Sequence, residues 1–401
     1  MIGARLADKG QLQAVALMFL TGTDSEVPYE HRNYITALLS LENALRVTGM
    51  TLIAAYSSSQ TPVVTGDFLT TQGAYNGFCL RKKVHRITSN LAVAWTGTIV
   101  VAEHVVGALH RRFANESPTA NELQQFLTSF KDGHFGTVRI ELIGWIFDGE
   151  YRCFRWRSDW PQELFFGEPQ YGGTGGPMIE AVLAQWRNVP FDNPARHVLQ
   201  SIGRLMEDEV ERHRNRTERF GFGYEALYGD GNAFTYVDDV LYLFGNVYFD
   251  AAGHYLRPEI QPKFFKYHSL SDDYALLQIE SYIPRGGQFF VQIDRHLITP
   301  VYESWKARAL AQQVFSASYP VPYDAKYSCF FINIVKDADT SNPQQLTHIT
   351  YVSASIDSIK PFSVLFKPVS EEEPLQGELS VRFPPREHLI SVYEDAIKAS
   401  S

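Results

Sequence analysis

Four residues near the start of a strand-rich stretch could together cleave an amide bond. Thr51 offers a hydroxyl, Asp67 a carboxylate, Lys83 a cation and Gly97 a backbone N–H. A threonine hydroxyl is a weak nucleophile, and a free α-amine at the chain terminus can serve as its general base. The pKa of such an amine is about 7.7–8.0, and a neighbouring lysine lowers it because like charges disfavour protonation. A carboxylate can hold that lysine, and a glycine N–H can donate to the oxyanion.

The run from Thr51 to Thr98 resembles the start of the mature proteasome β subunit and of the peptidase of the bacterial two-component heat-shock protease. Those proteins begin with the catalytic threonine. An aspartate follows sixteen residues later, a lysine thirty-two and an oxyanion-hole glycine forty-six, and Asp67, Lys83 and Gly97 stand at these intervals. A later glycine turn, GTGGP at 173–177, resembles the Gly-Ser-Gly turn of the family and puts Thr174 in the place of the site serine.

The resemblance covers about residues 51–250 and implies a four-layer αββα N-terminal-nucleophile (Ntn) hydrolase sandwich. It implies a threonine-type peptidase or amidohydrolase in which the Thr51 hydroxyl attacks and its own amine takes the proton. Asp67 would position Lys83, Lys83 would tune the amine, Gly97 would stabilise the oxyanion and Thr174 would support the amine. No cofactor and no metal are expected. The implied partners are a peptide or protein substrate and further copies in a homo-oligomer, and an ATP-dependent unfoldase is left open.

The sequence departs from the family pattern in two ways. The second aspartate and the serine of the last site strand have no match, since Glu218 and Gly221 stand there. Met50 precedes Thr51, so the threonine is internal and has no free amine. Cleavage between the two residues, or translation starting at Met50 followed by methionine removal, would expose it. The alternatives are an inert Ntn-fold scaffold that binds other proteins, and an amidase for small molecules, because a fold does not fix a function.

The order of elements predicts an α+β fold. Strands are expected over 51–56, 62–65, 83–87 and 91–95, then helices over 101–113 and 117–130, the second starting at Ser117-Pro118. A hairpin is expected around Asp148-Gly149, followed by helices over 178–186 and 197–214 and by strands after Gly223. From about 255 the pattern is mostly β, with helices over 301–315 and 386–398.

These patterns divide the chain into three parts. Residues 1–50, with a helical pattern over 36–47, form an N-terminal extension that is either a propeptide or an artefact of start-site choice. Residues 51–250 form the proteasome-like domain, and residues 251–401 form a C-terminal β-rich domain to which the sequence assigns no role.

Composition excludes several classes of function. The net charge is −9 and the chain has no basic run, which disfavours binding to nucleic acid. No apolar run is long enough to span a bilayer, so no membrane partner is expected. The three cysteines (Cys79, Cys153 and Cys329) form no CxxC pair, which argues against a zinc site and a disulfide framework and favours a cytoplasmic location.

Overall fold

The computed structural model describes residues 51–400 with internal gaps, and these residues belong to one compact unit. The predicted extension 1–50, the helix expected over 301–315 and Glu218 lie outside the described residues. The gaps are 59, 73–76, 131–134, 137, 168, 187–193, 213–219, 222, 232, 270–273, 282–288, 295–298, 301–324, 355–362 and 369–376.

Two five-stranded antiparallel sheets contain Asp67 and Gly97, and Thr51, Lys83 and Thr174 lie within two residues of their strand ends. The first sheet has the order β10 (Gln170–Gly172), β1 (Ile53–Ser58), β2 (Thr61–Asp67), β11 (Tyr224–Gly229), β12 (Phe234–Tyr236). The second has the order β5 (Val84–Thr88), β6 (Leu91–Gly97), β7 (Ile140–Phe147), β8 (Tyr151–Arg157), β9 (Leu164–Phe166). The strands predicted near 51–56, 62–65 and 91–95 and the hairpin around Asp148-Gly149 are therefore confirmed.

The alternation of side chains along β1 explains how the first sheet is buried on both faces. Ile53 and Ala55 share an apolar cluster with residues of the second sheet such as Trp145. Leu52 and Ala54 point the other way, into a second cluster that includes residues of two helices. Those helices are α5 (Gly176–Trp186) and α6 (Pro194–Arg212), and both contact β1.

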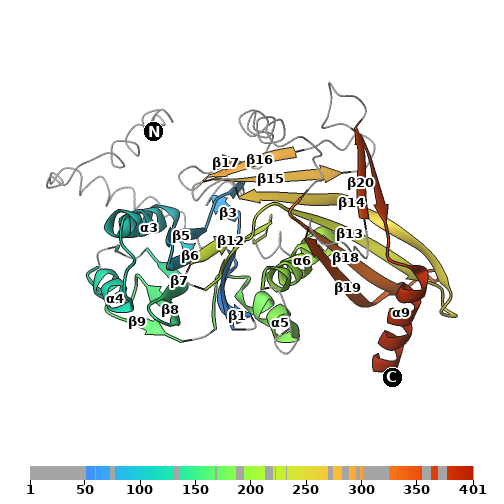
Figure 1. Cartoon of the computed structure of the whole chain (residues 1–401), viewed down its shortest axis with the longest axis horizontal. Helices are drawn as coiled ribbons and strands as arrows, with labels where there is room; N and C mark the ends of the chain where they lie inside the picture. Colours follow the sequence, from blue (N-terminus) through green and yellow to red (C-terminus); the bar gives the residue numbers. More distant parts are fainter. Residues whose placement is uncertain are drawn as a thin grey trace, which may run out of the picture. The chain divides into compact units, whose positions relative to one another are not determined.

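Two more helices pack on the second sheet, which gives the molecule its mixed α+β character (Figure 1). Helix α3 (Ile99–Phe113) contacts β5 and β6, and α4 (Ala120–Thr128) contacts β9. Helix α4 begins later than predicted, because Thr119 rather than Ser117 caps it: the Thr119 hydroxyl accepts from the Glu122 N–H, and the Glu122 carboxylate accepts from the Thr119 N–H. Among the helices that the structure describes, none has the length and apolar character needed to cross a bilayer.

The described elements after residue 250 are strands, apart from one terminal helix, as the sequence predicts. A six-stranded sheet has the order β16 (Phe289–Asp294), β15 (Tyr274–Ser281), β14 (Tyr255–Ser269), β13 (Val240–Phe249), β18 (Tyr327–Lys336), β19 (Gln344–Ala354). Smaller sheets join β17 (Thr299–Pro300), β4 (Gly77–Leu80) and β3 (Leu69–Gln72), and β20 (Ser363–Pro368) with β21 (Gly377–Arg382). Helix α9 (Arg386–Ser400) contacts β19.

Strand β13 connects the two halves of the six-stranded sheet. It pairs antiparallel with β14 on one edge and parallel with β18 on the other. Helix α6, which packs on the first sheet, also contacts β18 and β19. The six-stranded sheet thus runs across residue 250, where the sequence predicts a domain boundary; the boundary itself stays a prediction.

Candidate active site

The β1–β2 hairpin brings Thr51 next to Asp67. The strands pair from Ser58 opposite Thr61 back to Ile53 opposite Gly66, so the start of β1 lies beside the end of β2. The Thr51 hydroxyl donates to Asp67 Oδ1 at 2.5 Å, and the Leu52 N–H donates to the same oxygen at 2.9 Å. The sixteen-residue interval is therefore the length of one hairpin.

Lys83, directly before β5, completes a buried trio with Thr51 and Asp67. Its Nζ donates to Asp67 Oδ1 at 2.6 Å, to the Thr51 hydroxyl oxygen and to the Leu69 carbonyl. These three acceptors satisfy the three N–H donors of the ammonium group. Thr51, Asp67 and Lys83 are at most 2% exposed, so their interactions are only weakly screened by solvent.

Burial sets the protonation balance of this lysine. Desolvation lowers the pKa of Lys83, and the Asp67 carboxylate opposes that effect without cancelling it. A lysine whose pKa is lowered and whose Nζ contacts the threonine hydroxyl can stabilise negative charge developing on that oxygen, and it can exchange a proton with its surroundings more readily than a surface lysine.

The second carboxylate oxygen of Asp67 is held by a residue for which the sequence indicated no role. The Gly221 N–H donates to Asp67 Oδ2 at 2.8 Å, and the Gly221 carbonyl accepts from the Leu69 N–H at 3.0 Å. Gly221 has a φ of 116°, which favours glycine, and the nearby Gly223 has a φ of 89°. The pattern Gly221-x-Gly223 is therefore the sequence signal that pointed to a special backbone conformation at this contact.

The glycine turn after β10 packs its backbone against Thr51. The Gly175 N–H donates to the Thr51 carbonyl at 3.0 Å, and a Cβ at position 173 would lie 2.0 Å from that same carbonyl oxygen. Gly173 has a φ of 76°, so glycine is favoured there for two reasons. Thr174 lies between these two glycines, and its side chain is exposed.

Gly97 ends β6, opposite Ile140 of β7. It has a φ of 110°, and a Cβ there would lie 2.2 Å from the Arg139 carbonyl oxygen. The second sheet alone thus accounts for a glycine at this position. Direct contacts join Thr51, Asp67 and Lys83 to one another, whereas those that define Gly97 run to β7; the catalytic role of each residue stays a prediction.

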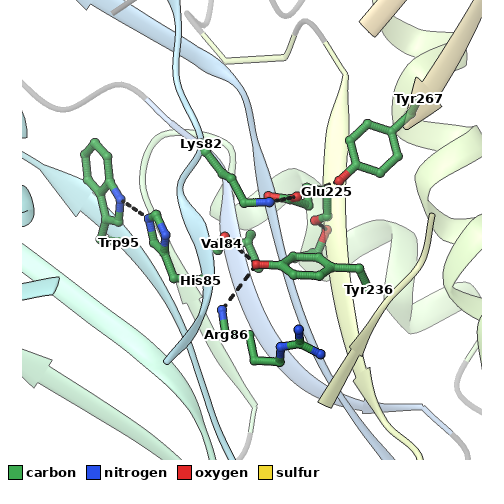
Figure 2. A network of polar contacts seen from close by, with 9 residues as sticks. Lys82, Val84, His85, Arg86, Trp95, Glu225, Tyr236 and Tyr267 are labelled. Carbon is green, nitrogen blue, oxygen red and sulfur yellow. Dashed lines mark hydrogen bonds and ion pairs between the residues drawn. The ribbon is translucent and has the colours of Figure 1, made fainter. Parts of the chain in front are cut away.

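A second buried ion pair lies one residue from Lys83 (Figure 2). Lys82 Nζ donates to Glu225 Oε1 and lies 4.1 Å from the centre of the Tyr236 ring. Both charged side chains of this pair are fully buried. The preceding residue, Arg81, pairs with Glu103 of α3. Three consecutive cations therefore reach three different carboxylates, a pairing that the Arg81-Lys82-Lys83 run does not reveal by itself.

The candidate site consists of a hydroxyl, a carboxylate and an ammonium group, those of Thr51, Asp67 and Lys83. No group of three or more His, Cys, Asp and Glu side chains in the described part of the chain is arranged to hold a metal ion. No protein-family model matches this chain, and no curated protein matches it.

Proposed function

We propose that this chain is an N-terminal-nucleophile hydrolase in which Thr51, once it becomes the terminal residue, cleaves amide bonds of peptides. The observation that carries the proposal is the buried contact of Lys83 Nζ with both the Thr51 hydroxyl and Asp67. A surface threonine with a chance ion pair nearby would not have a buried ammonium group in contact with its hydroxyl.

The proposed reaction has two steps. Thr51 Oγ attacks the carbonyl carbon of the amide while the free α-amine accepts the hydroxyl proton. The C–N bond then breaks, the leaving amine takes up that proton, and an ester joins the acyl group to Thr51. Water hydrolyses the ester and restores the hydroxyl. In this proposal Asp67 positions Lys83, Lys83 tunes the amine, the Gly97 N–H stabilises the oxyanion and Thr174 supports the amine.

The packing of the elements supports the same proposal. Helices α3 and α4 contact the second sheet, the second sheet shares a cluster with the first, and α5 and α6 contact the first sheet. We assign this arrangement to the four-layer αββα sandwich of Ntn hydrolases. The proposal extends to a homo-oligomer acting on unfolded peptides.

The test begins with the protein isolated from its own host. Intact-mass measurement and N-terminal sequencing determine whether the chain begins at Thr51, and a threonine-directed covalent probe reports whether that residue reacts. Labelling of a chain that begins at Thr51, lost in Thr51→Ala and retained in Thr51→Ser, is the expected result. Cleavage of peptide amides in preference to small amides separates a peptidase from a small-molecule amidase.

A specific observation favours a second function, that of a catalytically inert scaffold. Thr51 is only 2% exposed, so no substrate reaches it while the chain continues into Met50. An isolated protein that stays intact through Thr51 and fails to react with the probe would establish the scaffold and refute the hydrolase.

A further inference from the structure

Tyr267, on β14 of the six-stranded sheet, contacts Phe68 and Glu225, which connect it to the two charged residues of the candidate site. Its hydroxyl donates to Glu225 Oε1 at 2.5 Å (Figure 2). Its ring stacks on Phe68, with centroids 5.7 Å apart and an interplanar angle of 29°. Phe68 directly follows Asp67, and Glu225 pairs with Lys82, which directly precedes Lys83. The Tyr267 side chain is thus connected to Asp67 through Phe68 and to Lys83 through Glu225 and Lys82.

The carboxylates of the two buried ion pairs lie on two neighbouring strands. Strands β2 and β11 pair with Asp67 opposite Tyr224 and Gly66 opposite Glu225. The Thr65 hydroxyl donates to the Glu225 carbonyl at 2.8 Å and strengthens this register. Because the carboxylates of the two pairs come from neighbouring positions of one ladder, the backbone of that ladder links the two ion pairs.

The lysines are joined even more closely, since they are consecutive residues. The side chain of Lys82 is held by Glu225 and that of Lys83 by Asp67, and both lysines are at most 1% exposed. The partners of Lys82 therefore determine the path of the backbone from which Lys83 extends. The Tyr267 hydroxyl orients the Glu225 carboxylate by donating to it, and so acts on Lys83 indirectly, through Lys82.

From these contacts we infer that Tyr267 is a positioning residue for the site, acting through Glu225 and Lys82 to hold Lys83 against Thr51. Its catalytic meaning rests on the proposed function, whereas the positioning itself does not. The sheet after residue 250 then supplies an outer contact of the network around Lys83, while the direct partners of Lys83 lie within residues 51–250.

The experiment compares two tyrosine-to-phenylalanine variants of the full chain. Tyr267→Phe keeps the stacked ring and removes the hydroxyl. Tyr393→Phe is the matched control. Tyr393 lies on helix α9, outside the site, and its ring stacks on Phe249 with centroids 4.0 Å apart. Competitive reductive methylation, read by mass spectrometry, measures the reactivity of Lys83 in each folded protein, and the peptidase assay measures kcat and KM.

In Tyr267→Phe we expect Lys83 to become about tenfold more reactive and kcat to fall about tenfold with KM unchanged, the size expected for loss of one hydrogen bond to a charged group. Tyr393→Phe should match the wild type in both measurements. A folded Tyr267→Phe protein in which Lys83 is as protected as in the wild type would overturn the inference.

The outcomes for the two proposals are separable. If Thr51 of the wild type never reacts with a probe, the hydrolase is refuted, while a rise in Lys83 reactivity in Tyr267→Phe still establishes the positioning role. If Tyr267→Phe does not fold, Lys82→Met/Glu225→Gln, which removes both charges of the pair together, carries the same test: unchanged protection of Lys83 in that variant overturns the inference.

Discussion

Replacing Gly173 with alanine tests whether the glycine turn holds the Thr51 backbone. The new Cβ would lie 2.0 Å from the Thr51 carbonyl oxygen and 2.7 Å from Thr51 Cγ2, and the residue would keep a φ of 76°. Gly149 is a matched control, because it has a φ of 75° and a Cβ there would meet no atom within 4 Å. The two substitutions share the backbone strain and differ in the contact.

The expected sizes follow from this difference. A left-handed backbone conformation costs an alanine about 1–2 kcal/mol, which is the whole effect expected for Gly149→Ala. In Gly173→Ala the clash with a backbone carbonyl adds a displacement that typically costs a further ~1–3 kcal/mol. Gly173→Ala should therefore be less stable than Gly149→Ala by about 1–3 kcal/mol.

Denaturant unfolding monitored by tryptophan fluorescence measures both variants, and the threonine-directed probe measures the effect on Thr51. Gly173→Ala should unfold at lower denaturant than Gly149→Ala, and its Thr51 should label more slowly because the carbonyl that the turn holds has moved. Equal stabilities of the two variants, with equal labelling, would refute the assigned contact between the glycine turn and Thr51.

Three further outcomes are expected. Asp67→Asn leaves Lys83 buried without its carboxylate and should cost about 3–5 kcal/mol in denaturant unfolding, and adding Lys83→Met should recover part of that loss. Burial lowers the pKa of His197 to about 4 from about 6.5 in an unfolded chain, so the folded state binds this proton less readily. The contribution of neutral His197 to stability is complete above pH ~6.5 and is lost as the pH falls toward 4. Between pH 7 and pH 5, the free energy of unfolding of His197→Gln, measured by thermal unfolding, should therefore fall by roughly 2 kcal/mol less than that of the wild type. Burial also raises the pKa of the Cys329 thiol, so iodoacetamide should modify Cys329 at pH 8 only after unfolding, as mass spectrometry of the peptide that contains Cys329 would show.

The local parts of the site could be predicted from the sequence, and the long-range parts could not. Strand runs around a polar turn predict the β1–β2 hairpin, and a hairpin of that length brings Thr51 to Asp67 without further information. Gly221 meets Asp67 because β11 pairs with β2, a pairing that no local pattern specifies. The contact of Glu225 with Lys82 could not be predicted for the same reason, and Glu225 lies in a strand whose other residues are mostly apolar.

Lys82 shows why residue type misleads at such positions. A lysine in a charged run is normally solvated, and nothing in RKK distinguishes the residue that contacts Thr51 from its neighbours. Here all three cations are buried because each has a carboxylate partner on a different element. The start of α4 was misplaced for a simpler reason: Thr119 and Glu122 cap each other, and this capping box outweighs the preference of a proline for the first helical position.

The parallel pairing of β13 with β18 has a consequence for biosynthesis. The apolar strand VLYLFGNVYF leaves the ribosome long before Tyr327, its first partner residue on β18, has been translated. Through that interval one edge of β13 has no strand to pair with, and an unpaired apolar edge favours association between nascent chains. Closing such a distant contact is also slow. The yield of folded protein should therefore depend on chaperones and on the speed of translation between these two strands more than on the stability of the finished sheet.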